Sequence, residues 1–293
     1  MKGQPVIWAS LQAFRSLCCA IPHEKALSLG ALLGRTIERC SKKRIERARG
    51  RCERILGVSS REAERIISAS YAHFGKSLVE FIRLPLMADR LDELVTLTGE
   101  EHIRAAMNKG RGAIFLSAHI GNWEYGAALM ARRGFPMNAI GAEQRDPRIT
   151  DTIAELRKSA GVKPVGKGLD LKAALSCLRA GEVLAVLLDQ DARDAGVISP
   201  FLGFPASTPI GPIKLARKFG CPVLPVHVVR QPDGTHFSMT IEPALEGPGG
   251  EPFGENIQHA ADTCNAAISA WIRENPEQWL WMYPRWETTM DDK

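Results

Sequence analysis

The 293-residue sequence lacks several patterns that would assign it at once to a common class of protein. Its seven cysteines are scattered and form no C-x-x-C pair, which argues against a disulfide framework or a zinc knuckle and favours a reducing, cytoplasmic compartment. The metalloprotease motif H-E-x-x-H and the nucleophile elbow G-x-S-x-G are both absent. No low-complexity tract or solenoid repeat occurs. We therefore expect neither a metal nor a resident cofactor.

The N-terminal region combines an apolar segment with a basic one. Residues 6–21 are apolar and helix-competent, but Gln12 and Arg15 interrupt them, so the segment is short and polar for a transmembrane span. Between residues 35 and 54 there are nine Lys and Arg against three Glu, with no interleaved aromatic residue that could stack on nucleic-acid bases. This order is typical of a protein resting on an anionic membrane surface. A solvated helix face, and an N-terminal helix packed on its own core, are the alternatives.

The chain divides into a short leading helix and one α/β domain. We predict a membrane-associating helix over 1–22 and a single domain over 23–293, mostly helical at 23–95 and built on a sheet at 96–293. Four times after residue 100 a helical stretch, a glycine and an apolar run follow one another, with strands expected at 113–118, 137–142, 183–188 and 223–229. Buried strands alternating with helices predict a mainly parallel central sheet flanked by helices.

Polar side chains follow these strands, at the edge where open parallel sheets bind ligands. The first group is His119, which is followed five residues later by Glu124. On one regular helix the two would point roughly 140° apart. If His119 instead ends the strand and Asn122 caps a helix, Glu124 falls in the first helical turn, within reach of an imidazole nitrogen. We predict that Glu124 orients His119 and leaves the other ring nitrogen as a base.

Three motifs spread along the chain have a familiar order. They are the stretch S-A-H-x-G-N-W-E at 117–124, a block beginning with Asp189-Gln190-Asp191 and running through P-F-L-G and P-A-S-T to 225, and N-P-E-Q-W-L-W at 275–281 with Arg285-Trp286. Together they resemble the lysophospholipid acyltransferase superfamily, and specifically the lauroyl/myristoyl acyltransferases of lipid A biosynthesis. The similarity runs from near residue 5 to 287.

The resemblance implies a reaction that needs no serine nucleophile, which agrees with the absence of a nucleophile elbow. His119, oriented by Glu124, would act as general base on an acceptor hydroxyl, which would attack the thioester of acyl carrier protein or coenzyme A. The acceptor would be a glycolipid, most naturally a lipid A precursor, at the cytoplasmic face of the inner membrane. Substrate contacts are expected from Asn122, Arg145, Arg157, Asp189 and Gln190. The arginines would meet anionic substrate groups; ordinary surface arginines are the alternative.

Other functions remain open at this point. Another lipid, such as a phosphatidylinositol mannoside or a lysophospholipid, could be the acceptor. A lipid ester hydrolase, in which His119 activates water, and a non-catalytic lipid-binding protein belong to different classes. The C-terminal region holds four of the six tryptophans, for which core packing is favoured over direct lipid contact: residues 271, 279, 281 and 286.

Overall fold

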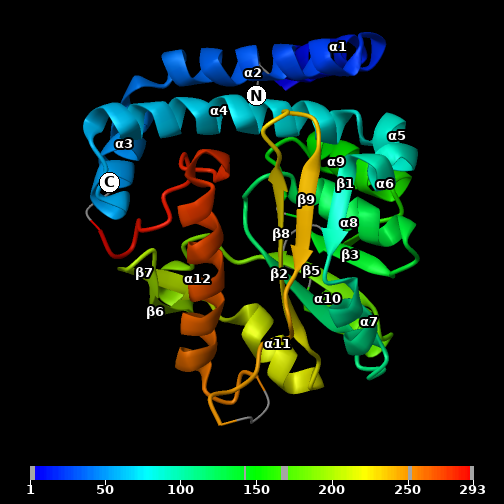
Figure 1. Cartoon of the computed structure of the whole chain (residues 1–293). Helices are drawn as coiled ribbons and strands as arrows, with labels where there is room; N and C mark the ends of the chain where they lie inside the picture. Colours follow the sequence, from blue (N-terminus) through cyan, green and yellow to red (C-terminus); the bar gives the residue numbers. More distant parts are fainter. Residues whose placement is uncertain (1–3, 142, 166–170, 250–252, 291–293) are drawn as a thin grey trace.

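The first third of the chain is helical. The structure is a computed structural model that describes residues 4–141, 143–165, 171–249 and 253–290 (Figure 1). Helix α4 begins after Ser59, whose side chain accepts a hydrogen bond from the Glu62 N–H at 3.3 Å, and it ends before Pro85, both as predicted. The helices of this region are α1 (Gln4–Ala20), α2 (His23–Cys40), α3 (Lys42–Leu56), α4 (Ser60–Ile82), α5 (Leu84–Met87), η1 (Ala88–Arg90) and α6 (Leu91–Leu94).

The central sheet has seven strands in the order β1-β9-β8-β2-β5-β3-β4. Strands β8, β2, β5, β3 and β4 run parallel, whereas β9 is antiparallel to β8 and carries β1 alongside it. The mainly parallel sheet and its four expected strands are confirmed, although Ala142 at the end of one lies outside the described residues. The bounds are β1 (Val95–Thr98), β2 (Ala113–Ser117), β3 (Met137–Ile140), β4 (Lys163–Val165), β5 (Val183–Leu187), β8 (Val223–Arg230) and β9 (Phe237–Ile241).

Helices cover both faces of this sheet, because the side chains of each strand alternate between two buried clusters. On β2, Ile114 and Leu116 pack with α3, α4, α10, α11 and α12, while Ala113 and Phe115 pack with α5 to α8. A separate hairpin, β6–β7, lies against α12. The remaining elements are α7 (Glu100–Met107), α8 (Trp123–Arg132), α9 (Pro147–Ser159), α10 (Leu171–Arg179), η2 (Arg193–Ala195), β6 (Gly196–Phe201), β7 (Phe204–Pro209), α11 (Gly211–Phe219), α12 (Ile257–Glu274) and η3 (Pro276–Gln278).

The predicted helix ends are confirmed by backbone conformation. Gly110, Gly134, Gly181 and Gly220 all have positive φ, at 67°, 87°, 72° and 59°. Side chains with a Cβ are strained in this region, whereas glycine adopts it freely. Each of these glycines therefore ends a helical stretch and lets the chain turn into the next strand.

Helices α1 and α2 lie along α4 at one edge of the molecule (Figure 1). In the described ranges, no helix combines the length and the apolar content needed to cross a bilayer. Cys18 of α1 and Ala26 of α2 are buried against Val79 and Ile82 of α4. One face of the N-terminal helix thus packs on the protein's own core, as one of the alternatives held, while its association with a membrane stays a prediction.

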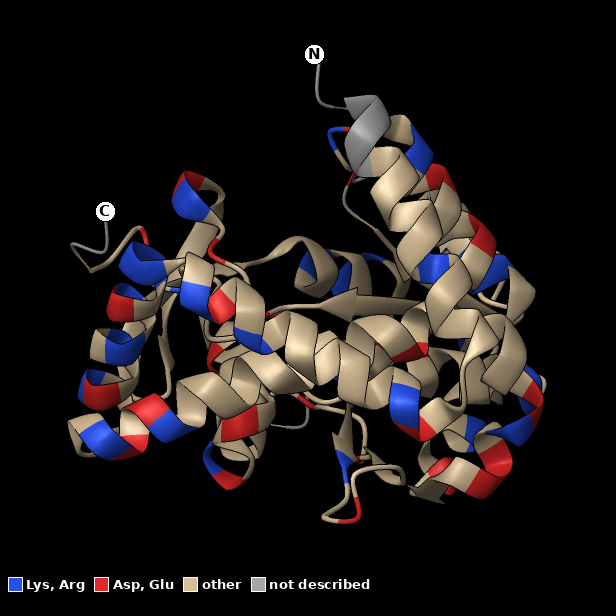
Figure 2. Cartoon of the chain, turned by 90° about the horizontal axis from the view of Figure 1, so that it is seen from above, with Lys and Arg blue, Asp and Glu red and all other residues tan. Residues whose placement is uncertain are grey.

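Part of the basic run is used inside the protein. Arg51 is buried and donates a hydrogen bond to the Trp281 carbonyl oxygen at 2.8 Å, and Arg49 pairs with Glu64 at 2.9 Å. Figure 2 shows acidic residues interspersed with the lysines and arginines along the helices of this region. The anionic partner predicted from the run would therefore meet only its exposed members.

Candidate active site

His119 lies two residues beyond the end of β2, in a tight turn that leads into α8. The turn requires Gly121, whose φ is 58° and where a Cβ would lie only 1.6 Å from the Val228 carbonyl oxygen. Asn122 then caps α8, since its side chain accepts the Tyr125 N–H at 3.1 Å, as predicted. This strand-turn-helix arrangement displays the imidazole at the carboxyl edge of the parallel strands, where such sheets place their ligand sites.

Asp189, and not Glu124, orients the His119 ring. One Asp189 carboxylate oxygen lies 2.8 Å from His119 Nδ1, and the other accepts the His119 backbone N–H at 2.9 Å and the Trp279 indole N–H at 2.8 Å. Burial raises the pKa of Asp189, but the attraction to His119 and these hydrogen bonds outweigh it and lower the pKa below its usual value. A carboxylate accepts only, so Nδ1 donates and Nε2 is left as the basic nitrogen.

Glu124 has a different partner, which corrects the prediction that it orients the imidazole. Arg157 of α9 grips its carboxylate with two hydrogen bonds, from Nε at 3.0 Å and from Nη2 at 2.6 Å. The Trp123 indole N–H adds a third at 3.2 Å. The physical reason is direction: in the first turn of α8 the Glu124 side chain faces α9, while β5 delivers Asp189 directly beside His119. Burial lowers the pKa of Arg157, but the attraction and hydrogen bonds of Glu124 prevail and raise it.

The remaining predicted substrate contacts are distributed unevenly. Asn122 and Arg157 are buried near His119, with their polar groups engaged by protein partners. Gln190 follows Asp189 directly and is half-buried. Arg145 is exposed on the connection before α9. The structure therefore gathers most of these residues at one edge of the sheet and leaves Arg145 on the surface.

Two aromatic rings border the imidazole. The Trp123 ring meets it edge-on, with centroids 5.0 Å apart, and Tyr283 stacks on it at 5.5 Å with planes 21° apart. Sequence reasoning missed Tyr283 and the hydrogen bond from Trp279 to Asp189. The C-terminal signature was the available signal, since this segment binds the turn that contains His119: the Leu280 N–H donates a hydrogen bond to the His119 carbonyl oxygen at 3.1 Å.

Core packing of the four C-terminal tryptophans is confirmed. Their exposed fractions are 3% or less. Trp279 and Trp286 pack against Phe201, Trp281 packs against Trp279, and Trp271 packs against His227. Trp279 also makes a polar contact within this core, because its indole N–H donates a hydrogen bond to the Asp189 carboxylate. Its burial and its hydrogen bond agree with the usual behaviour of a buried indole, which seeks an acceptor.

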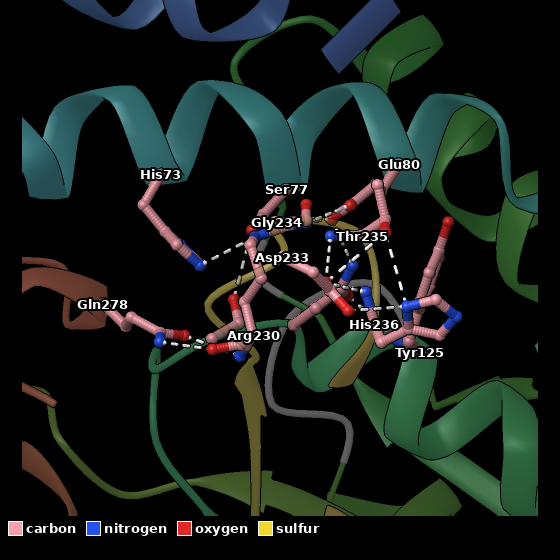
Figure 3. Close-up of polar contacts among 12 residues, drawn as sticks. His73, Ser77, Glu80, Tyr125, Arg230, Asp233, Gly234, Thr235, His236 and Gln278 are labelled. Carbon is pink, nitrogen blue, oxygen red and sulfur yellow. Dashed lines mark hydrogen bonds and ion pairs between the residues drawn. The ribbon is translucent and has the colours of Figure 1, made fainter. Parts of the chain in front are cut away.

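A buried ion pair anchors the turn that contains His119 to α4. Arg230 at the end of β8 donates to Glu80 through Nη1 at 2.5 Å and Nη2 at 2.6 Å, and Asn122 donates to the same carboxylate at 2.8 Å. Figure 3 shows Arg230 between Glu80, His73 and Gln278. Burial, with Arg230 and Lys76 nearby, keeps the pKa of His73 well below its usual value despite a hydrogen bond with Gln278. The neutral ring accepts the Arg230 Nε–H at 3.2 Å.

Two cavities adjoin the turn. A small pocket beside α4, named the polar pocket after its serine and histidine side chains, is lined by Ser70, His73, Phe74, Ser77, His119, Gly121, Trp123 and Gln278 to Leu280. A larger cavity, partly open to solvent, lies between the sheet and α8 and is lined mainly by apolar side chains of β2, β3, β5, β8 and β9, with Glu124 and Arg157 at its border. Across the described residues, no three His, Cys, Asp or Glu side chains are grouped to hold a metal ion.

Comparison with known proteins gives one consistent family. The sequence model of the bacterial lipid A biosynthesis acyltransferase family matches residues 3–288. A phosphatidylinositol mannoside acyltransferase of Mycobacterium tuberculosis is 28% identical, covering 82% of this chain and 77% of that protein. The lipid A biosynthesis palmitoleoyltransferase and lauroyltransferase of Escherichia coli are 26% and 25% identical, each covering 98% of this chain and 90% of the relative.

Proposed function

The chain belongs to the bacterial lipid A biosynthesis acyltransferase family, and from this premise we propose that it transfers a fatty acyl chain from a carrier thioester to a hydroxyl of a glycolipid. A lipid A precursor is the proposed acceptor. The observation that carries the proposal is the His119–Asp189 pair, with Nδ1 held at 2.8 Å and Nε2 left for the substrate. No serine or cysteine nucleophile is needed for direct transfer.

The proposed reaction has two steps. His119 Nε2 takes the proton of the acceptor hydroxyl as its oxygen attacks the thioester carbonyl carbon, giving a tetrahedral intermediate and an imidazolium. The C–S bond then breaks, the thiolate leaves with the bonding pair, and the imidazolium returns the proton to that sulfur. Asp189 stabilises the imidazolium and fixes its orientation, as a carboxylate does for a catalytic histidine in serine hydrolases. The products are the ester and the free carrier thiol.

The apolar cavity is the proposed site of the acyl chain. It lies against Ser117 and Trp123 at the end of β2, and its walls are the side chains of Phe115, Val226 and Met239 among others. Burial of each methylene contributes roughly 0.8 kcal/mol, so a chain inserted here gains affinity with length until the cavity is filled. The Glu124–Arg157 pair at the border satisfies both charges internally, so no unpaired charge of this pair faces the apolar chain.

We propose that α1 and α2 rest on the cytoplasmic face of the inner membrane. Leu17 of α1 and Leu32 and Ile37 of α2 are exposed, and exposed Arg35 and Arg39 accompany them on α2. Exposed apolar side chains beside cations suit an anionic bilayer surface, which would also supply the lipid acceptor. The donor is acyl carrier protein or coenzyme A; the basic surface favours an acidic carrier through charge complementarity.

A second candidate acceptor is a phosphatidylinositol mannoside. The M. tuberculosis relative named for that acceptor has an identity to this chain at least as high as the E. coli relatives. The reaction at His119 would be the same, and only the groups that hold the acceptor would differ.

The test is an acyl-transfer assay on the full chain with labelled acyl carrier protein or acyl coenzyme A. Each donor is paired with a lipid A precursor, a phosphatidylinositol mannoside or a lysophospholipid, and products are identified by mass spectrometry. We expect ester formation that His119→Ala lowers by about 10²- to 10⁴-fold, the usual contribution of a positioned base. His102→Ala, on α7, is the matched control. A fully active His119→Ala enzyme would remove this base from the mechanism, and free fatty acid as the only product would favour a hydrolase.

A further inference from the structure

Trp123 stands where the two cavities of the active site meet. The polar pocket is lined by His119 and by side chains of α4, whereas the larger cavity is lined by apolar side chains of the sheet and α8. Among the described residues that line them, only Trp123 belongs to both. Trp123 thus lies at the boundary between a pocket that contains the proposed base and a cavity with mainly apolar walls.

The position of this indole is fixed from two directions. Its N–H donates to Glu124 Oε1 at 3.2 Å, and Glu124 is itself held by two hydrogen bonds from Arg157. Its ring meets His119 edge-on, with centroids 5.0 Å apart and planes at 74°. Through these contacts the chain Arg157–Glu124–Trp123 borders one side of the imidazole, while Asp189 binds it from another. This gives the carboxylate of Glu124 a task that does not require contact with His119.

We propose that Trp123 is a specificity-determining partition that keeps water away from the thioester while the acceptor hydroxyl occupies the polar pocket. The inference rests on the proposed function. Two nucleophiles compete for the thioester carbonyl carbon, the acceptor hydroxyl and water, and His119 can deprotonate either one. Attack by water breaks the C–S bond to give a fatty acid and the carrier thiol. An apolar side chain between His119 and the acyl chain suppresses that side reaction by excluding water from the space next to the base, as active sites do.

The two cavities should therefore merge when the indole is removed. The thioester carbonyl would lie at this boundary, within reach of an acceptor oxygen bound at His119. Trp123→Ala widens the boundary, so that a water activated by His119 reaches the same carbon without an acceptor in place. Trp123→Phe keeps an aromatic ring in the gap but lacks the N–H that binds Glu124, so its position is less well fixed. The ratio of hydrolysis to transfer should thus rise most in Trp123→Ala and less in Trp123→Phe.

The experiment measures released fatty acid and acylated lipid in the same reaction, for the full chain with a labelled acyl thioester and the acceptor that the native protein uses. We expect the hydrolysis-to-transfer ratio to rise roughly tenfold or more in Trp123→Ala, in line with the rate cost of small misplacements in active sites. Met239 lines only the apolar cavity, and Phe74 lines only the polar pocket. Met239→Ala and Phe74→Ala therefore each enlarge one of the two. Both residues line a proposed substrate site, so each control should slow the reaction, but each leaves the partition in place, and the hydrolysis-to-transfer ratio should stay near the native value.

A ratio that is unchanged in both Trp123 variants, while transfer falls, would overturn the partition and leave Trp123 a packing residue. A ratio that rises equally in the Met239 and Phe74 variants would also overturn it, because general loosening would then explain the effect. Trp123→Phe decides the matter if the alanine variant fails to fold, as judged by near-UV circular dichroism. Absence of transfer by the native protein with every acceptor would instead contradict the proposed function, which keeps the two failures distinct.

Discussion

Replacing Asp189 by asparagine tests the central pair of the site. The carboxylate accepts three hydrogen bonds, from His119 Nδ1, the His119 backbone N–H and the Trp279 indole, at 2.8, 2.9 and 2.8 Å. An amide has only one accepting atom in place of two and brings an NH₂ group that donates. If the amide oxygen faces Nδ1, the amide NH₂ group lies against two other donors, the His119 backbone N–H and the Trp279 indole N–H, and both lose their acceptor. If the amide is flipped, its NH₂ faces Nδ1 and stabilises the tautomer that has its proton on Nε2.

The flipped arrangement removes the base, because Nε2 then carries a proton and cannot accept another from the acceptor. The corresponding substitution in a serine protease lowers kcat by about 10⁴-fold, which sets the upper end of the expected loss. We expect kcat to fall by roughly 10²- to 10⁴-fold in Asp189→Asn. Hydrogen bonds to a charged group contribute about 1.5 to 3 kcal/mol each, so losing at least one buried bond should lower the Tm of a chain of this length by roughly 2 to 5 °C.

The assay is steady-state acyl transfer, with thermal unfolding of the same preparations. Asp191→Asn is the matched control, since Asp191 lies two residues away and binds Thr288 on the surface. Asp189 lines neither cavity, so the KM for the thioester should change by less than about threefold. If Asp189→Asn kept more than a third of the native kcat while folded, the assignment of Asp189 as the orienting group would be wrong.

Three further changes probe the support of the site. Glu124→Leu should cost about 3 to 5 kcal/mol of unfolding free energy because it leaves Arg157 buried and unpaired, while the double variant with Arg157→Leu should recover much of this in chemical denaturation. Gly121→Ala should abolish transfer and lower Tm, since its Cβ would overlap the Val228 carbonyl; a native-like Tm would contradict the required turn. Burial lowers the pKa of His227 to about 4, so between pH 6.5 and 4 the unfolded chain binds more protons than the folded one. The free energy of unfolding should therefore decrease as the pH is lowered from 6.5 to 4. His227→Phe should lessen this dependence in denaturation curves, while His73 and His23, whose pKa values are also lowered, keep the rest of it. An unchanged slope would exclude His227 as a source.

Local signals in the sequence identified most of the elements around the site. The turn at His119, the cap at Asn122 and the glycines that end helices depend on a few adjacent residues, and the structure confirms them. The partner of His119 depends instead on strand order. Because β5 pairs with β2, with Leu187 opposite Ser117, the residues two positions beyond each strand end are His119 and Asp189.

The long-range pairings explain the two misses. Nearness in sequence favoured Glu124 as the group that orients His119. In the structure α8 directs the Glu124 side chain toward α9, where it binds Arg157. The residues next to Glu124 in the sequence do not indicate this partner. Tyr283 reaches the imidazole only because the C-terminal segment returns to the turn, where Ile120 pairs with Trp279. Sequence motifs indicated that these segments matter for function, but not which atoms they bring together.

The close packing of α2 on α4 has a consequence for work at a lipid surface. A Cβ at Gly34 would lie 2.0 Å from the Tyr71 carbonyl oxygen, and one at Gly75 would lie 2.0 Å from that of Gly30, so the two backbones touch directly. Neither helix can slide or roll on the other without a backbone collision. Helix α4 is about 35 Å long at 1.5 Å per residue. It also contacts the turn that contains His119, because the Ser77 hydroxyl donates a hydrogen bond to the Gly121 carbonyl oxygen. The distance from His119 to the outer face of α2 is therefore fixed, so in the proposed orientation on a membrane the protein would reach acceptor hydroxyls at one depth in the lipid layer.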